Sequence, residues 1–254
     1  MRLRIVVLCL AVTAGGLRPA DPLTVSAAIS LTDSLEAVAR SYAASGGDPV
    51  RFNFAGSNVL ARQLVNGAPA DVFVSADEAQ MDVAERAGAI DRASRVALLG
   101  NRLAVITRKD NATGSSIRKV QDLGREDVRR IALGDPAAVP AGVYARNYLQ
   151  TAGVWPQVAS KIVPVANVRA ALTVVENGSA DAAIVYETDA ALASQAVTAF
   201  IVTGPAAPRI VYPAAVVTHS RQPQAAQRFL LFLTGPQATP IFRKFGFTPL
   251  ATMP

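Results

Sequence analysis

The sequence predicts an α/β protein with two lobes, and three observations support this prediction. Short apolar, strand-like runs alternate with helical patterns along the chain, an order typical of mostly parallel sheets flanked by helices. Of the 254 residues, 51% are hydrophobic and 17% are charged, which suffices for one large core or two modest ones. Without an expected export signal, roughly 230 residues remain, more than a usual single domain.

The N-terminus predicts a signal peptide over residues 1–20. Arg2 and Arg4 precede the apolar run IVVLCLAVTA, residues 5–14, and this order of a basic and then an apolar segment is typical of secretion. The run is too short to span a bilayer comfortably. We expect cleavage near residue 14 or residue 20, and a mature protein in the periplasm.

Strands and helices are predicted from hydrophobic spacing and from breaks at Gly, Pro and Asn. The predicted strands are 23–29, 50–54, 71–75, 102–107, 131–133, 161–165, 182–185, 199–202 and 210–218. The predicted helices are 31–45, 58–66, 78–87, 141–152, 168–176, 188–196, 223–233 and 236–245. The stretch DNATGSS, residues 110–116, indicates a surface loop.

The lobes are expected to exchange the chain twice, through strands 102–107 and 210–217. The last part of the chain is mainly two helices, which cannot form a domain alone and should pack on the first lobe. We therefore expect one lobe to contain residues 22–101 with 216–254, and the other to contain residues 102–215.

Composition excludes several classes of function. The net charge is +6, but the basic residues are scattered and no basic stripe is interleaved with aromatics, so no nucleic-acid partner is expected. Cys9 is the only cysteine and lies in the expected signal, so the mature chain should hold no disulfide and no thiol chemistry. His219 is the only histidine, which excludes a metal site built from several histidines. We expect no enzyme activity and no cofactor.

Candidate ligand-binding residues stand where strands give way to helices, because ligands of open α/β sheets bind at the carboxyl ends of strands. The N–H groups that begin a helix are unpaired and favour anions. The candidates at these junctions are Ser30, Ser57, Ala141, Val168 and Tyr186. Taken together they are small, neutral or hydrogen-bonding, which suits a small oxyanion and suits a zwitterionic amino acid poorly.

Each junction also has a purely structural interpretation. Ser30 with Asp33 resembles a variant capping box, and serine or asparagine is an ordinary helix cap. The Ala-Gly pair at 141–142 could serve only tight packing, and Tyr186 could be an ordinary residue at the edge of a core. Arg169 opens a predicted helix, and we expect it to be a surface or supporting charge whose replacement weakens binding little.

Several stretches resemble the periplasmic molybdate-binding proteins of ABC importers, in order and over almost the whole mature chain. The stretches are AAISLTDSL, FAGSNVLARQLVNGAPADVFVSAD, LLGNRLAVI, LGDPAAVPAGVYARNYL, VRAALTVVENGSADAAIVY and YPAAVVTHS. The resemblance implies a type II periplasmic binding fold that closes on molybdate or tungstate. It also implies a monomer that delivers the anion to the permease and ATPase of an importer.

The same resemblance implies which groups bind the anion. Ser30 and Ser57 would donate from hydroxyl and backbone N–H, Ala141 and Val168 from backbone N–H, and Tyr186 from its hydroxyl. Molybdenum would be bound only as an oxyanion, with no direct cation ligand. Two stretches depart from the common pattern, with isoleucine at position 29 and the loop AGSNV at 55–59, and both departures bear on selectivity.

Three alternatives remain open at this point. A receptor for sulfate or phosphate would fit the same junctions, and Asp33 or Asp135 could accept a proton from phosphate. An enzyme could use acidic residues for acid–base work, although no recognisable motif pairs them; these are Asp71, Asp77, Asp135 and Glu187. An effector-sensing domain of a transcription regulator would need a DNA-binding segment, whereas this chain begins with an export pattern.

Overall fold

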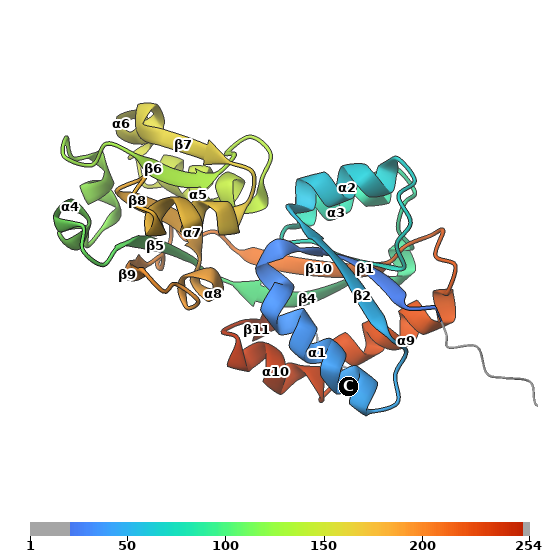
Figure 1. Cartoon of the computed structure of the whole chain (residues 1–254). Coiled ribbons are helices and arrows are strands. Elements are labelled where there is room, and N and C mark those ends of the chain that lie inside the picture. Colours follow the sequence, from blue (N-terminus) through green and yellow to red (C-terminus); the bar gives the residue numbers. More distant parts are fainter. Residues whose placement is uncertain (1–20, 251–254) are drawn as a thin grey trace, which may run out of the picture.

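The computed structural model describes residues 21–250, which form two lobes joined by two crossings of the chain (Figure 1). The predicted signal peptide lies outside the described residues. The chain leaves the first lobe between β4 (Val96–Asn101) and β5 (Leu103–Arg108), and it returns between β9 (Ala196–Ile201) and β10 (Ile210–Val216). No helix within residues 21–250 combines the length and apolar character needed to cross a membrane.

The first lobe is a six-stranded sheet with helices on both faces. Its strand order is β11-β4-β10-β3-β1-β2, with β1 Leu23–Ala28, β2 Val50–Ala55, β3 Val72–Val74 and β11 Thr248–Pro249. Helices α2 and α3 cover one face, and α1, α9 and α10 cover the other (Figure 1). The bounds are α1 Thr32–Ala44, α2 Ser57–Val65, α3 Glu78–Arg86, α9 Pro223–Thr234 and α10 Ala238–Lys244.

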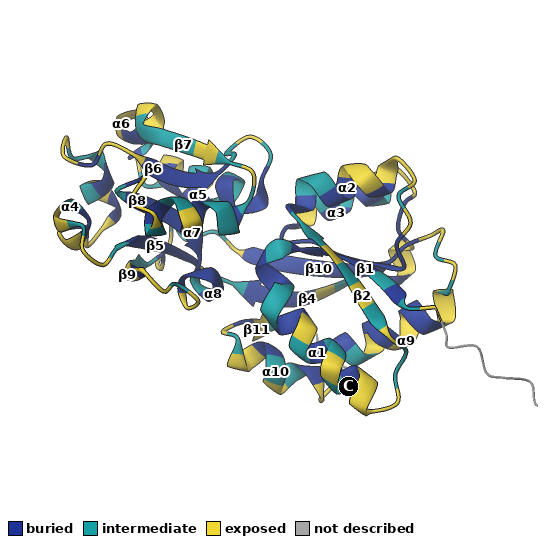
Figure 2. Ribbon diagram, viewed as in Figure 1, coloured by how far each residue is buried: buried dark blue, intermediate teal, exposed yellow. Residues whose placement is uncertain are grey.

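The second lobe contains a five-stranded sheet of order β7-β6-β8-β5-β9. Its remaining strands are β6 Ile131–Gly134, β7 Ile162–Val165 and β8 Ala182–Tyr186. Its helices are α4 Ala112–Ser115, α5 Pro140–Thr151, α6 Trp155–Val158, α7 Val168–Glu176 and α8 Glu187–Ala190. The central strands of both sheets are buried, whereas the edge strands β2, β7 and β9 are partly exposed. The outer faces of the helices are exposed (Figure 2), as expected for amphipathic helices.

Parallel pairing occurs where a helix connects two strands, and it places the strand ends of each lobe at one edge. In the first lobe β1 pairs in parallel with β2 and β3, so Ala28 lies opposite Ala55 at the carboxyl ends. In the second lobe β6 pairs in parallel with β7 and β8. The segments that follow these strands face each other across the space between the lobes.

The structure differs from the sequence prediction in several places. Both sheets are mixed rather than mostly parallel, because the hinge strands β4, β5, β9 and β10 pair antiparallel with their neighbours. β10 pairs with β4 from Ile210 and with β3 from Ala214, so the return to the first lobe lies near residue 210 and not near 216. The predicted loop at 110–116 contains the one-turn helix α4, which Asn111 caps.

Candidate functional site

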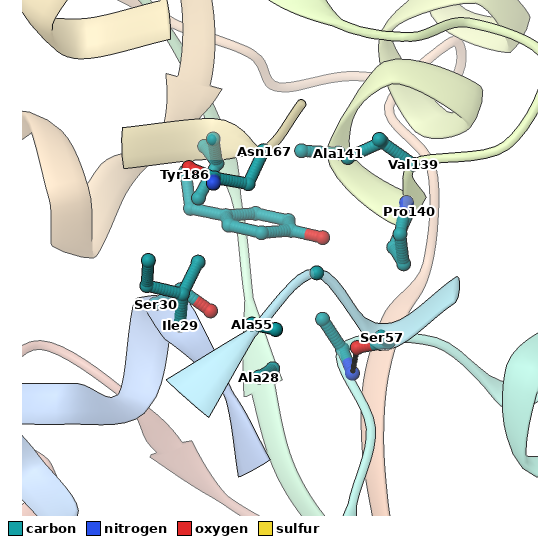
Figure 3. Close-up of a pocket in the computed structure, with 13 residues that line it drawn as sticks. Ala28, Ile29, Ser30, Ala55, Ser57, Val139, Pro140, Ala141, Asn167 and Tyr186 are labelled. Atoms are coloured by element: carbon teal, nitrogen blue, oxygen red, sulfur yellow. Dashed lines mark hydrogen bonds between the residues drawn. The ribbon is translucent and has the colours of Figure 1, made fainter. Parts of the chain in front are cut away.

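A cavity lies between the lobes, at the edge where the parallel strands end (Figure 3). Its empty volume is about 220 Å³, including its open mouth. All five predicted ligand residues line it, three from the second lobe and two from the first. The complete lining is Ala28, Ile29, Ser30, Ala55, Gly56, Ser57, Ala76, Val139, Pro140, Ala141, Asn167, Val168 and Tyr186.

Ser30 follows β1 in a single 3₁₀ turn, Ile29–Leu31, and does not cap a helix. The residue that precedes α1 is Leu31, and no side chain accepts a hydrogen bond from that helix end. The Ser30 hydroxyl is buried and lies 3.1 Å from the hydroxyl of Tyr212 on β10. The capping-box interpretation of Ser30 and Asp33 is therefore wrong, and the hydroxyl is available to the cavity.

Ser57 is the first residue of α2 and is almost completely buried. Its Oγ accepts a hydrogen bond of 2.9 Å from the backbone N–H of Ala76, which follows β3. A hydroxyl that accepts on one side keeps its single hydrogen for another partner. Ser57 is thus held as an acceptor toward the protein and can donate into the cavity.

Two helix N-termini of the second lobe point their backbone at the same space. Ala141 is the second residue of α5, after Pro140, and Val168 is the first residue of α7. The first four N–H groups of an α-helix have no partner within the helix. The side chain of Asn167 caps α7 by accepting from Ala170 N–H at 2.9 Å, which leaves the Val168 N–H unused by this cap.

Tyr186 ends β8 and directs its hydroxyl into the middle of the cavity (Figure 3). The side chain is 1% exposed, and its hydroxyl has no hydrogen-bond partner within residues 21–250. An unpaired buried hydroxyl costs free energy, so its persistence indicates a ligand. Burial raises the pKa of Tyr186 well above its ordinary value, so the phenol stays neutral and acts as a donor.

Among the residues that the structure describes, no carboxylate lines the cavity. Asp33 pairs with Arg169 at 2.7 Å, and Asp135 accepts from the backbone N–H of Ala137 at 2.8 Å. Neither is therefore placed to accept a proton from a bound phosphate. The lining polar groups are hydroxyls, backbone amides and the capping amide of Asn167, which form a neutral, donor-rich site.

The other acidic residues considered for catalysis have structural roles. Asp71 accepts from Thr24 N–H, Asp77 caps α3 by accepting from Gln80 N–H, and Glu187 pairs with Arg102. His219 is exposed and does not line the cavity. No pair of acidic groups is thus arranged around the cavity for acid–base chemistry.

Arg169 connects the two lobes, and of the two expected roles this fits a supporting charge better than a surface charge. Its guanidinium, on α7, contacts the carboxylate of Asp33 on α1 and the fully buried carboxylate of Asp189 on α8. Burial alone would lower the pKa of Arg169, but the two carboxylates raise it, so the side chain stays charged. Since both contacts are ion pairs, the side chain points at carboxylates and not at the cavity.

Sequence reasoning missed Tyr212 and Asn101, which support the site from behind. Asn101 Nδ2 lies 3.3 Å from the Tyr212 hydroxyl and 2.9 Å from Thr188 Oγ1. Tyr212 begins the quoted stretch YPAAVVTHS, and a tyrosine inside a fully buried strand is the signal that could have revealed it. Ile29 lines the cavity and packs against the core.

Comparison with known families and relatives places this geometry in context. Residues 23–248 match the family described as bacterial extracellular solute-binding protein. The molybdate-binding protein ModA of Escherichia coli K12 is 40% identical over 248 residues, covering 95% of this chain and 94% of the relative. The chain belongs to the bacterial extracellular solute-binding proteins. The resemblance to molybdate-binding proteins predicted from the motifs is confirmed by this relative.

Further relatives agree in sequence and in fold. The ModA protein of Haemophilus influenzae is 34% identical, with 89% of each chain covered. Among solved structures, the periplasmic molybdate-binding protein of Azotobacter vinelandii superposes with a TM-score of 0.77 at 24% identity, covering 89% of this chain and 98% of that chain. The sulfate-binding protein SubI of Mycobacterium tuberculosis superposes with a TM-score of 0.80 at 22% identity, covering 90% and 87%. Both structures show the fold alone, and they confirm the two-lobe type II periplasmic binding fold.

Proposed function

We propose that the chain captures molybdate between its lobes and delivers it to an ABC importer. Tungstate, which has the same charge and shape, is proposed as a second ligand. The observation that carries the proposal is the convergence of five neutral donors on one cavity, with the buried Tyr186 hydroxyl unpaired. The proposed ligand groups are the hydroxyls and amides of Ser30 and Ser57, the amides of Ala141 and Val168, and the Tyr186 hydroxyl.

The chemistry of the cavity supports an anion that only accepts hydrogen bonds. A fully deprotonated tetrahedral dianion presents four acceptor oxygens, and hydrogen bonds to a charged acceptor contribute roughly 1.5–3 kcal/mol each. Hydrogen phosphate carries a hydroxyl that needs an acceptor, and no carboxylate of the described part of the chain lines the cavity. Phosphate is therefore disfavoured by its proton, and sulfate can be discriminated only by its smaller size.

Membership of the solute-binding family supports a proposal for where the protein acts and which partner it meets. A mature protein released by cleavage of residues 1–20 would act as a monomer in the periplasm. Because the ligand groups come from both lobes, binding assembles the site by closure. The closed form is then the state that the permease and ATPase complex of the importer would recognise.

Isothermal titration calorimetry of residues 21–254 with four anions tests the proposal. We expect molybdate and tungstate to bind tightly, sulfate much more weakly and phosphate weakest. Calorimetry is preferred to tryptophan fluorescence, because Trp155 lies on α6 under the Arg146 guanidinium and does not line the cavity. Sulfate binding as tight as molybdate binding would overturn the assignment to molybdate.

A further inference from the structure

A chain of hydrogen bonds runs from the hinge to the binding cavity. Asn101 ends β4 at the first crossing between the lobes, and its Nδ2 lies 3.3 Å from the hydroxyl of Tyr212. Tyr212 is fully buried on β10, and its hydroxyl lies 3.1 Å from the Oγ of Ser30. A residue of the hinge thus reaches a proposed ligand residue through one intermediate.

The direction of donation along this chain is fixed at the Asn101 end. The Oδ1 of Asn101 accepts from the backbone N–H of Arg102 at 2.8 Å, so the NH₂ group faces the other way. Its two hydrogens are directed at Thr188 Oγ1 and at the Tyr212 hydroxyl. An NH₂ group cannot accept a hydrogen bond, so the Tyr212 oxygen must accept from Asn101.

The orientation of the Ser30 hydroxyl follows from that of Tyr212. A phenol has one hydrogen, and the Tyr212 hydroxyl lies within hydrogen-bond distance of both Asn101 Nδ2 and Ser30 Oγ. We infer that Tyr212 gives this hydrogen to Ser30, which leaves the hydrogen of Ser30 for the cavity. Ser57 reaches the same state by accepting from the Ala76 N–H. Both serines are thus oriented to donate to an anion.

We propose that Asn101 and Tyr212 are positioning residues that orient the Ser30 hydroxyl to donate to the bound oxyanion. Asn101, at the hinge, sets the direction of donation. The proposal rests on the proposed function, because it assumes that an anion occupies the cavity. Neither residue touches the cavity itself, since Asn101 and Tyr212 are absent from its lining. Their effect on binding would pass through Ser30, which is hydrogen-bonded to Tyr212, while the Tyr212 ring also packs against Tyr186 with centroids 5.6 Å apart.

The test first reverses the direction of the hydrogen bonds between Asn101, Tyr212 and Ser30, and then removes the link at Tyr212. In Asn101→Asp the new carboxylate only accepts, so Tyr212 would donate to it, accept from Ser30 and turn the Ser30 lone pairs toward the anion. We expect molybdate affinity to fall roughly 10- to 100-fold, as for the loss of one hydrogen bond to a charged group. Tyr212→Phe removes the hydrogen bond to Ser30 without reversing its direction, and it should lower molybdate affinity fivefold or less. Asn53→Asp, an exposed change on β2, controls for the added charge.

The double variant Asn101→Asp with Tyr212→Phe decides the question. With phenylalanine at position 212 the inversion cannot reach Ser30, so the double variant should bind molybdate as Tyr212→Phe does, more tightly than Asn101→Asp alone. If it binds as weakly as Asn101→Asp, charge or local distortion is the cause and the proposal is overturned. Molybdate binding by the unaltered protein tests the proposed function separately.

Neutron diffraction from the deuterated, unaltered protein tests the same proposal if Asn101→Asp does not fold. We expect the deuterium between Tyr212 and Ser30 to lie on the tyrosine oxygen. A deuterium on Ser30 Oγ that points at Tyr212 would show the opposite polarity and overturn the proposal.

Discussion

At the scale of single residues, the hydrogen bonds of the Ser30 hydroxyl distinguish a helix-capping role from a ligand-binding role. Ser30 makes no capping hydrogen bond, and within residues 21–250 its hydroxyl is hydrogen-bonded only to the Tyr212 hydroxyl. We expect Ser30→Ala to lower molybdate affinity roughly 10- to 100-fold, because one donor to a charged acceptor is lost. The unliganded protein should lose only about 1 kcal/mol of stability, the value of one ordinary hydrogen bond. Calorimetry and chemical denaturation measure the two effects.

Ser34→Ala is the matched control for this prediction. Ser34 is a second buried serine of the same segment, and its Oγ donates to the backbone oxygen of Leu31 at 3.0 Å without lining the cavity. We expect a comparable change in stability with unchanged affinity. A Ser30→Ala protein that loses stability but binds molybdate normally would contradict a ligand role for Ser30.

The site residues that could be predicted from sequence are those that depend on local structure. A serine after a strand, or a small residue at a helix start, is recognisable from its neighbours alone, as at Ser57 and Ala141. Tyr212 contacts Ser30 across 182 residues of sequence. Such a contact depends on which strand lies beside β3 in the sheet, and hydrophobic spacing carries no information about it.

At the scale of secondary structure, helices were predicted better than sheet topology. The predicted helix 168–176 agrees with α7 because a strong amphipathic pattern and the Asn167 cap mark its limits. The antiparallel hinge strands were not predicted, because alternating strands and helices favour parallel pairing unless the chain returns from another lobe. The short helix α8 ends at Ala190, whereas its prediction extended to 196, and β9 begins there.

The short helix α8 carries a buried acid that should make stability depend on pH. Asp189 is fully buried, and burial raises its pKa from 3.8 to about 7 although Arg169 opposes the shift. Since the raised pKa means tighter proton binding in the folded state, the stabilisation is complete below pH 3.8 and is lost as pH rises through about 7.

Asp189→Asn removes the titrating group, so comparison with this variant measures how much of the pH dependence of stability comes from Asp189. Thermal unfolding of the unliganded protein between pH 5 and pH 8 should show the unaltered protein losing stability relative to Asp189→Asn, by at most about 1.4 kcal/mol per pH unit. The difference should level off above the folded-state pKa. A difference that stays constant over this range would show that Asp189 is ionised throughout.

At the scale of the whole molecule, closure of the two lobes is supported by an ion pair beside the cavity. Arg169 lies next to Val168, which lines the cavity from the second lobe, while Asp33 lies one turn after Ser30 in the first lobe. The ion pair therefore joins the two halves of the proposed site. Asp189 anchors the guanidinium on the second lobe, so Asp33 is the partner that closure must bring in.

Asp33→Asn weakens only the arm of this ion pair that reaches the first lobe. The Asp33 side chain is 43% exposed, and such pairs contribute up to about 1 kcal/mol, so we expect molybdate affinity to fall by at most about fivefold. The loss should appear as faster dissociation in stopped-flow measurements, because closure is less stable, and it should shrink at high salt. Asp48→Asn breaks the Arg228–Asp48 pair within the first lobe and should leave dissociation unchanged. Equal effects of the two substitutions would contradict a role for the Arg169–Asp33 pair in closure.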